Sequence, residues 1–301
     1  MIDELEDSEM MNYWMGSVLV TGATGQLGHL VLDALLKTLP ASRVIAAVRN
    51  PAKAGDLSDK GFVVREADYD RPETLDMAFA GVDKILLISS SEVGKRAGQH
   101  KAVISAAKRA GVKLLAYTSL LHADKSVLGL AEEHRLTEEA IRASGIPFVL
   151  LRNGWYIENH TAGIPSALQH GAFLGSAKDG RFSSATRRDY AEAAAAVLTA
   201  SESQAGKTFE LAGDDSYTLA DLAAEVTRQS GKSVIYKDLP EVDFCAALIL
   251  AGFPKPIAAM LAESDVGASK GALYDESRVL SRLIGRPATS LKAAVAEALK
   301  G

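Results

Sequence analysis

The chain of 301 residues has a single cysteine, Cys245. One thiol can form neither an internal disulfide nor a thiolate cage for a metal ion. We expect Cys245 to be a small buried apolar residue within a helical stretch at residues 242–251. This cysteine usage is compatible with a reducing compartment, and we expect a cytoplasmic protein.

Long apolar runs and an excess of basic residues are also missing. No apolar run reaches the roughly 18 residues that a membrane-spanning helix needs, so we expect no membrane span. There are 33 Lys and Arg against 38 Asp and Glu, a net charge of −5. Because nucleic-acid binding needs a basic face, we expect no nucleic-acid partner.

The first 14 residues contain acidic side chains but no Lys or Arg. That is the wrong charge for a secretory signal or an organelle transit peptide. We interpret residues 1–14 as a disordered extension or as a misassigned start, with Met15 as the first residue.

Between residues 17 and 151, short apolar runs alternate with segments of helical periodicity. The expected strands are 18–21, 43–48, 62–65, 84–88, 114–118 and 147–151, and the expected helices are 26–39, 72–80, 95–110 and 130–143. Strands that are apolar throughout and separated by helices indicate a parallel sheet covered on both faces. We therefore predict an α/β fold with a Rossmann-like doubly wound parallel sheet in residues 15–152.

Residues 153–301 are less regular, and we expect them to form a smaller C-terminal α/β lobe that binds substrate and is interwoven with the first. The elements expected here are a helix at 187–200, a strand at 208–211, a helix from the N-cap Thr218 to Gln229, a strand at 233–237 and two further helices, the last at 291–299. We expect a loop at 264–274. No flexible linker separates the two lobes.

The turn after the first expected strand carries glycines at the spacing G-x-x-G-x-x-G. Gly22 permits a tight turn out of the strand, Gly25 lets a pyrophosphate approach the backbone, and Gly28 lets the helix pack close to the sheet. The N-terminus of the helix then offers N–H groups and a partial positive charge to phosphates. Because the motif lies at a strand-to-helix junction, it predicts a dinucleotide site.

Arg49 ends the second strand, where an NAD site would favour an acid for the ribose 2′-hydroxyl. An arginine instead suits a 2′-phosphate, and Lys53 adds charge one turn later. We therefore expect NADP(H) as the cofactor. Asp68 and Tyr69 end the third strand, where we expect the adenine. The fourth strand ends in three hydroxyls that we expect at the nicotinamide ribose, namely Ser89, Ser90 and Ser91.

These features, with further motifs along the chain, resemble the NmrA-like group of atypical short-chain dehydrogenases/reductases, and within it the bacterial type 2 NADPH:quinone oxidoreductases, relatives of triphenylmethane reductase. The motifs are VTGATGQLGHLV at 20–31, VRNPAKA at 48–54, ISSSEVG at 88–94, AYTSLLHAD at 116–124, LRNGWY at 151–156 and DVGASKG at 265–271. The resemblance covers residues 15–299.

The resemblance implies an NADPH-dependent reductase of quinones or similar small planar acceptors. The pyrophosphate contacts that it implies are Gly22, Ala23, Thr24, Gly25, Gln26 and Leu27. It implies that Arg49 binds the 2′-phosphate. The residues that it places beside the nicotinamide half are Ser89, Ser90, Ser91, Asn153, Gly154, Trp155, Tyr156, Ile157 and Glu158.

The chain departs from ordinary short-chain dehydrogenases in lacking the Tyr-x-x-x-Lys pair. If Glu138 matches the acid that follows this pair, Leu130 replaces the tyrosine and His134 the lysine. Alcohol–ketone interconversion needs a strong general acid/base and is disfavoured. Quinone reduction by direct hydride transfer, without flavin or metal, needs positioning and a hydrogen bond to the developing oxyanion.

The candidate catalytic donors are Asn153, Tyr156 and His134, and none of them is assigned as the proton donor. His122, after the fifth strand, could also approach the ribose. The remaining histidines, which we expect on the surface or on a helix face, are His29, His100, His160 and His170. No histidine has metal-ligand spacing, so we expect no metal site.

Two other functions remain open on the sequence. Relatives in the NmrA-like group include redox-sensing regulators that bind NADP(H) and a partner protein without catalysis. A different planar acceptor, such as a cationic dye or an activated alkene, is a further option, because Rossmann sites serve many chemistries. A homodimer is compatible with the sequence.

Overall fold

The computed structural model of the chain describes residues 16–300, so the interpretation of residues 1–14 lies outside the described residues. The chain divides into two compact units. Within the described residues, unit 1 comprises residues 16–118, Thr137–Leu150 and Ala191–Thr208, and unit 2 comprises Ser119–Leu136, Leu151–Tyr190 and residues 209–300. Each unit has its own cluster of buried apolar residues.

The main sheet has seven strands in the order β3-β2-β1-β4-β5-β6-β8. These strands are β1 (Val18–Val20), β2 (Val44–Val48), β3 (Val63–Glu66), β4 (Lys84–Leu87), β5 (Leu114–Leu120), β6 (Phe148–Asn153) and β8 (Thr208–Leu211). The pairs β1–β2, β1–β4, β2–β3 and β4–β5 are parallel. The order reverses between β1 and β4, as in a Rossmann sheet, and this confirms the predicted α/β fold class.

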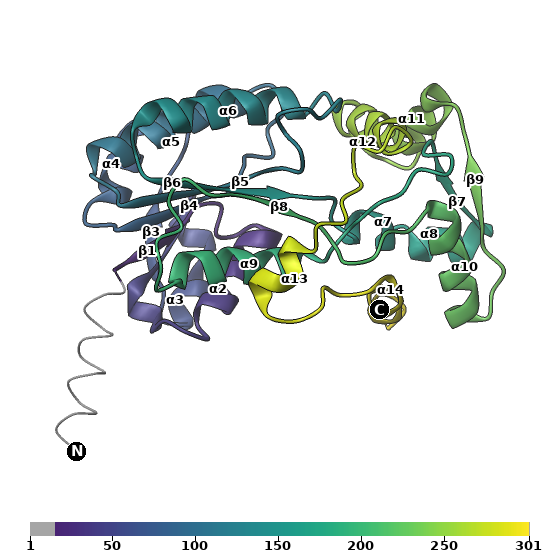
Figure 1. The fold of residues 1–301 in the computed structure, drawn as a ribbon, viewed down its shortest axis with the longest axis horizontal. Helices are drawn as coiled ribbons and strands as arrows, with labels where there is room; N and C mark the ends of the chain where they lie inside the picture. The colour runs from purple at the N-terminus through teal and green to yellow at the C-terminus, as the bar shows by residue number, and fades with distance from the viewer. Residues whose placement is uncertain (1–15, 301) are drawn as a thin grey trace, which may run out of the picture. The chain divides into compact units, whose positions relative to one another are not determined.

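Strands β1, β2 and β5 are buried at every residue. In unit 1, α4, α5 and the C-terminal part of α6 cover one face of the sheet, and α2 lies on the other (Figure 1). The helices and turns that contribute to unit 1 are α2 (Gln26–Leu35), η1 (Ala41–Arg43), η2 (Pro51–Lys53), α3 (Gly55–Asp59), α4 (Pro72–Phe79), α5 (Arg96–Arg109), α6 (Ala131–Ser144) and α9 (Arg187–Thr199). Apolar strands are therefore sandwiched between helices, as their composition predicts.

Helix α2 is shorter than predicted, since it ends at Leu35 rather than at residue 39. The N–H groups of Lys37 and Thr38 bond three residues back, to Ala34 and Leu35. This tighter winding ends the helix before Pro40, which disfavours helical geometry in the residue ahead of it.

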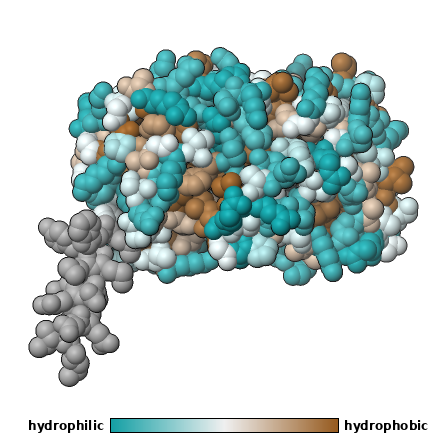
Figure 2. All heavy atoms as spheres, viewed as in Figure 1, coloured by the Kyte–Doolittle hydropathy of each residue, from teal (hydrophilic) through white to brown (hydrophobic). Residues whose placement is uncertain are grey.

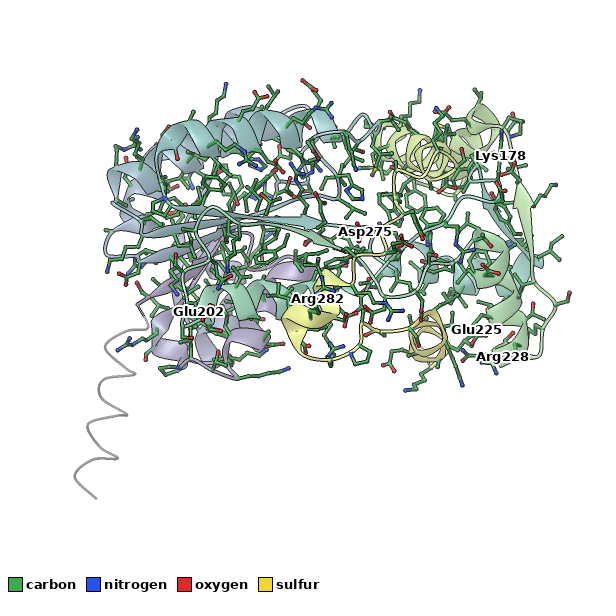
Figure 3. All side chains as sticks on the ribbon, viewed as in Figure 1. Lys178, Glu202, Glu225, Arg228, Asp275 and Arg282 are labelled. Carbon is green, nitrogen blue, oxygen red and sulfur yellow. The ribbon has the colours of Figure 1, made fainter. Side chains whose placement is uncertain are left out.

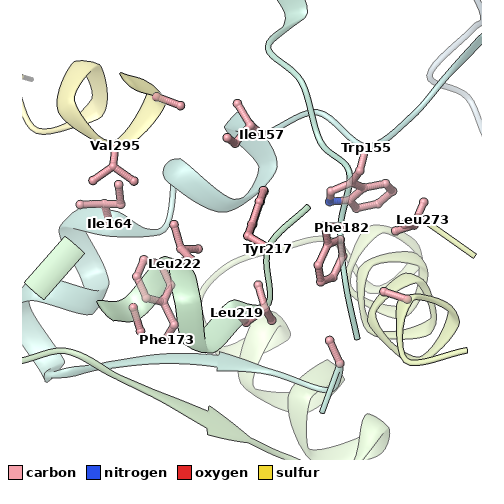
Figure 4. Packing of buried hydrophobic residues seen from close by; sticks show 14 of the residues in the cluster. Trp155, Ile157, Ile164, Phe173, Phe182, Tyr217, Leu219, Leu222, Leu273 and Val295 are labelled. Carbon is pink, nitrogen blue, oxygen red and sulfur yellow. The ribbon is translucent and has the colours of Figure 1, made fainter. Parts of the chain in front are cut away.

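Unit 2 contains a second, two-stranded parallel sheet of β7 (Ala172–Gly175) and β9 (Ile235–Asp238). Its further helices are α7 (Glu158–Thr161), α8 (Ile164–His170), α10 (Leu219–Ser230), α11 (Glu241–Leu250), α12 (Lys255–Ala268), α13 (Val279–Ile284) and α14 (Leu291–Ala298). Figure 4 shows part of its core, in which Trp155, Phe182 and Leu273 pack together.

The expectation of two helices after β9 is wrong, because α11 to α14 all follow it within the described residues. The loop expected at 264–274 is partly helical, since α12 continues to Ala268. A Cβ on Gly267 would overlap the Leu128 side chain, so α12 lies close to Leu128 at this point. Tertiary packing here outweighs the low helix propensity of glycine.

Cys245 lies in a helix, as expected, but it is half-buried rather than buried. Helix α11 has no fully buried residue, and Val242 and Leu250 are exposed. None of the helices in residues 16–300 has the length and apolar character to span a bilayer. Hydrophilic residues cover most of the face shown in Figure 2.

Candidate functional site

The glycine turn between β1 and α2 has the geometry that the sequence predicts. Gly22 has a φ of +59°, a backbone conformation that residues other than glycine rarely adopt. The N–H of Gly25 donates to the Gly22 carbonyl at 2.9 Å. A Cβ on Gly28 would lie 2.8 Å from the Ala23 Cα, so only glycine lets α2 lie this close to the turn.

The N-terminus of α2 is open to an anion. Its N-cap, Gly25, has no side chain to bond the first N–H groups, and the first turn has no acidic residue. Such a helix end presents unpaired N–H groups and a partial positive charge. Within the turn, Gly22, Thr24, Gly25 and Gln26 are exposed, whereas Ala23 and Leu27 are buried. The turn is therefore built to receive a phosphate group on its outer side.

Arg49 follows β2 as an exposed side chain, with 72% of its surface accessible. Its Nη1 lies 3.3 Å from Glu92 Oε1, and Glu92 is also paired with Lys95 at 3.0 Å. The hydrogen bond from Lys95 lowers the pKa of Glu92. Exposed ion pairs of this kind are weak, so moving the Arg49 side chain away from Glu92 costs little free energy.

Asp68 and Tyr69 lie after β3, where we expected the adenine. The Asp68 carboxylate accepts from the Asp70 N–H and pairs with Arg71 at 3.2 Å, so it organises the local turn. The Tyr69 hydroxyl donates to the Ile88 carbonyl at 3.3 Å, and burial raises the pKa of Tyr69 to about 12.

Of the three serines after β4, Ser89 and Ser90 are held by hydrogen bonds of their backbone N–H groups. Ser89 N–H donates to Thr118 Oγ1 at 2.9 Å, and Ser90 N–H donates to His100 Nε2 at 3.0 Å. Ser89 and Ser90 are half-buried and Ser91 is exposed. Their hydroxyls thus stand at the carboxyl edge of the sheet on a fixed backbone.

His100, which was expected on the surface or on a helix face, lies on a face of helix α5, and it is fully buried there. Burial lowers the pKa of His100 to about 3, so the ring is neutral. Since Nε2 accepts from Ser90, Nδ1 carries the proton and donates to Thr137 Oγ1 at 2.9 Å. The signal was available: His100, Val103, Ile104 and Ala107 share the apolar face of one helix.

In unit 2, the last residue of β6 and the residues after it form a buried turn. Asn153 is 5% exposed, its carbonyl accepts from the Leu121 N–H at 2.9 Å, and its Oδ1 has no hydrogen-bond partner among residues 16–300. A Cβ on Gly154 would lie 3.0 Å from the Tyr190 hydroxyl. The Trp155 carbonyl accepts from the Ala185 N–H at 3.3 Å.

The next three residues differ in what they contact. The Tyr156 ring has the Arg187 guanidinium 4.5 Å from its centroid. Ile157 is part of the core of unit 2. Glu158 begins α7, and its Oε1 accepts from the Arg187 N–H at 2.8 Å. Arg187 therefore holds both Tyr156 and Glu158.

Of the candidate donors, His134 is buried on α6. His122 has an unusual backbone, with a φ of +53°, and its N–H donates to Glu210 Oε2 at 2.8 Å. Its ring lies between two carboxylates, Glu210 at 3.6 Å and Asp275 at 3.4 Å (Asp275 is labelled in Figure 3). Glu210 is in turn paired with the buried Arg152 at 2.8 Å.

Unit 1 thus brings together the glycine turn, Arg49 and Ser89–Ser91, all after strands β1, β2 and β4. Unit 2 brings together Asn153–Glu158 with Arg187. Across residues 16–300, no cluster of three or more His, Cys, Asp or Glu side chains is arranged to hold a metal ion.

A glycine turn and an open helix end at the point where the strand order reverses define a dinucleotide-binding protein of the Rossmann class. The chain belongs to the NmrA-like family, whose model matches residues 15–297. This confirms the resemblance inferred from the motifs.

Individual relatives match over nearly the whole chain. Quinone oxidoreductase 2 of Escherichia coli (strain K12) is 59% identical over 278 residues, which is 92% of this chain and 97% of that protein. The crystal structure of the E. coli NADPH-dependent quinone oxidoreductase QOR2 with NADPH has a TM-score of 0.90 at 58% identity and covers 94% of this chain and 99% of its own. Citrobacter sp. triphenylmethane reductase with NADP(H) has a TM-score of 0.90 at 41% identity, covering 94% of this chain and 100% of its own.

Proposed function

We propose that this chain is an NADPH-dependent reductase of quinones. The observation that carries the proposal is the 59% identity to a quinone oxidoreductase across 97% of its length. The geometry of unit 1 supports it, because the glycine turn, the open end of α2 and the exposed Arg49 form a phosphate-binding edge. Such an edge suits a dinucleotide with an additional phosphate.

The residues of unit 1 fit NADPH as follows. The turn from Gly22 to Leu27 would hold the pyrophosphate, since a side chain at Gly28 would push α2 away from it. Arg49 would bind the 2′-phosphate in place of Glu92, with Lys53 adding charge. The hydroxyls of Ser89, Ser90 and Ser91 would line the nicotinamide ribose.

The segment from Asn153 to Glu158 would complete the nicotinamide side. Asn153 Oδ1, buried and without a partner in residues 16–300, suits the N–H₂ of the nicotinamide carboxamide. We assign nucleotide binding to residues 15–152 and acceptor binding to residues 153–301. We further propose a cytoplasmic homodimer.

Bound NADPH supplies a hydride, and no flavin or metal is needed. The protein's part is to align the acceptor, exclude water and hydrogen-bond the oxygen that gains charge. If Glu138 matches the acid that follows a Tyr-x-x-x-Lys pair, Leu130 and His134 stand in the places of that pair, and Leu130 cannot donate a proton. This suits a quinone, which gains aromaticity on reduction and needs little acid catalysis.

The test is the loss of NADPH absorbance at 340 nm with purified protein and 1,4-benzoquinone. We expect quinone-dependent oxidation that is faster with NADPH than with NADH and unchanged by chelator or by flavin removal. Tight NADPH binding without turnover, across several quinones, would contradict the proposal and favour an NADP(H)-binding regulator. Turnover only with a dye or an activated alkene would keep the reductase and change its acceptor.

A further inference from the structure

Glu92 is the acidic residue of the ISSSEVG motif at residues 88–94. It follows the three serines after β4, and its side chain is 33% exposed. Its Oε1 lies 3.3 Å from Nη1 of Arg49, the first residue after β2. Because β1 lies between β2 and β4, this ion pair connects the segments on either side of the strand that leads into the glycine turn. Glu92 therefore engages Arg49 at the edge of the sheet where phosphate binding is proposed.

The backbone around Glu92 is held by hydrogen bonds within its own segment. The Glu92 N–H donates to Ser90 Oγ at 3.2 Å, and its carbonyl accepts from the Lys95 N–H at 3.0 Å. The Ser90 carbonyl accepts in turn from Arg96 Nε at 2.5 Å. The Arg49 side chain, by contrast, is 72% exposed. Separation of the pair is therefore expected to be a movement of Arg49, with Glu92 staying in place.

Glu92 keeps other partners when Arg49 moves away. Its Oε2 lies 3.0 Å from Lys95 Nζ, and Gln99 hydrogen-bonds the same carboxylate. The hydrogen bonds from Lys95 and Gln99 lower the pKa of Glu92, so the carboxylate is ionised at neutral pH. Release of Arg49 thus leaves Glu92 paired, and its cost is that of one exposed ion pair.

A phosphate group suits the Arg49 guanidinium better than Glu92 does. The contact of 3.3 Å to Glu92 is longer than the roughly 2.7–2.9 Å of strong charge-assisted hydrogen bonds. A phosphate monoester carries a charge of about −1.5 to −2 at neutral pH and three acceptor oxygens. A planar guanidinium can bond two such oxygens at once. Glu92 is therefore a weak competitor that a phosphate displaces, but at some cost in affinity.

We propose that Glu92 competes with the 2′-phosphate of the nucleotide for the Arg49 guanidinium, and that it thereby weakens the binding of NADPH and NADP⁺. This rests on the proposed function. NADPH and NADP⁺ carry the same 2′-phosphate, so Glu92 weakens both to the same extent and shortens the time for which oxidised nucleotide stays bound. NADH has no 2′-phosphate and binds outside this competition.

The test is the variant Glu92→Gln, which keeps the shape of the side chain and removes its charge. We expect the Kd values for NADPH, NADP⁺ and adenosine 2′,5′-bisphosphate, measured by calorimetric titration, to fall about two- to five-fold, the range that an exposed ion pair allows. The Kd for NADH should not change. The gain should shrink at high salt, because salt screens exposed charges. Unchanged or weaker binding of NADPH would overturn the inference.

A matched control removes a carboxylate from another exposed arginine pair. Asp76 Oδ1 lies 2.6 Å from Nη2 of Arg109, the last residue of α5, whereas Glu92 precedes the start of that helix. Asp76→Asn is expected to leave the Kd for NADPH unchanged. An equal gain in Asp76→Asn and Glu92→Gln would assign the effect to net charge and overturn the inference.

A double-mutant cycle with Arg49→Ala separates competition from simple repulsion of the phosphate. Without Arg49 there is no guanidinium to compete for, so adding Glu92→Gln to Arg49→Ala should leave the Kd for adenosine 2′,5′-bisphosphate unchanged. The same gain with and without Arg49 would show that Glu92 acts by repulsion alone and would overturn the inference. Absence of NADPH binding by the wild-type protein would instead refute the proposed function.

Discussion

At the scale of single residues, we predict that Arg49 sets the preference for NADPH over NADH. Its guanidinium is exposed, and its ion pair with Glu92 is a weak surface contact. Arg49→Ala removes charge-assisted hydrogen bonds to the 2′-phosphate, which are worth about 1.5–3 kcal/mol. We expect the Kd for NADPH to rise about 10–100-fold and that for NADH to change less than two-fold, measured by fluorescence titration. An equal loss for both cofactors would refute the assignment.

Gly28 is a second decisive residue, because its missing side chain lets α2 lie against the turn. Gly28→Ala places a methyl group within 3 Å of Ala23 and of the Gly22 carbonyl. We expect a destabilisation of about 1–3 kcal/mol and weaker NADPH binding, measured by denaturant unfolding and by titration. Gly98→Ala in α5 is the matched control, because its methyl would meet nothing within 4 Å and should stabilise the helix. Equal behaviour of the two variants would contradict this packing argument.

At the scale of elements, two hydrogen bonds in the first turn of α10 stabilise the start of this helix. Thr218 accepts from the Asp221 N–H at 3.0 Å, and the Asp221 carboxylate accepts from the Thr218 N–H at 2.9 Å. Later in the helix, Glu225 and Arg228 form an exposed ion pair (Figure 3). Thr218→Ala should cost about 1 kcal/mol in unfolding free energy, whereas Thr218→Ser should cost little. A similar loss in both variants would assign the effect to the methyl group of threonine instead of the cap.

At the scale of the whole molecule, buried titratable groups set the pH dependence of stability. Burial lowers the pKa of His100 to about 3 and that of His160 to about 4, below the value of an unfolded histidine. Below about pH 6.5 these two histidines therefore bind more protons in the unfolded chain than in the folded one. The stability that the buried neutral rings contribute is present above about pH 6.5 and is lost as the pH falls. Burial raises the pKa of Asp265 to about 7, so this carboxyl takes up a proton in the folded state first. Its effect is to raise the unfolding free energy as the pH falls below about 7.

We predict that the pH dependence of the unfolding free energy differs between wild type and two variants, His100→Gln and Asp265→Asn. Between pH 6.5 and 5, wild type should lose about 2 kcal/mol more unfolding free energy than His100→Gln. Asp265→Asn should instead lose more than wild type over the same interval, because it lacks the carboxyl that takes up a proton on folding. Urea unfolding at several pH values measures both slopes, and parallel slopes for wild type and His100→Gln would show that His100 is not buried in the neutral form.

The sequence determined the parts of the molecule that depend on neighbours along the chain. Apolar runs predicted strands β1 to β6 to within a few residues, and Thr218 marked the start of α10. The turn with Gly22, Gly25 and Gly28 was readable because its glycines lie within seven residues. The roles of Arg49, Ser89–Ser91 and Asn153–Glu158 in binding NADPH stay predictions.

Only the tertiary structure decided which polar groups are buried and what they contact. His100 accepts a hydrogen bond from the Ser90 N–H, and Arg152 pairs with Glu210. His160 packs against the rings of Phe182 and Tyr217. Most of these partners lie tens of residues apart, and local periodicity says nothing about which distant segments meet. The same reason applies to the error at α12, where Gly267 lies against Leu128, a residue far away along the chain, in a segment that was expected to be a loop.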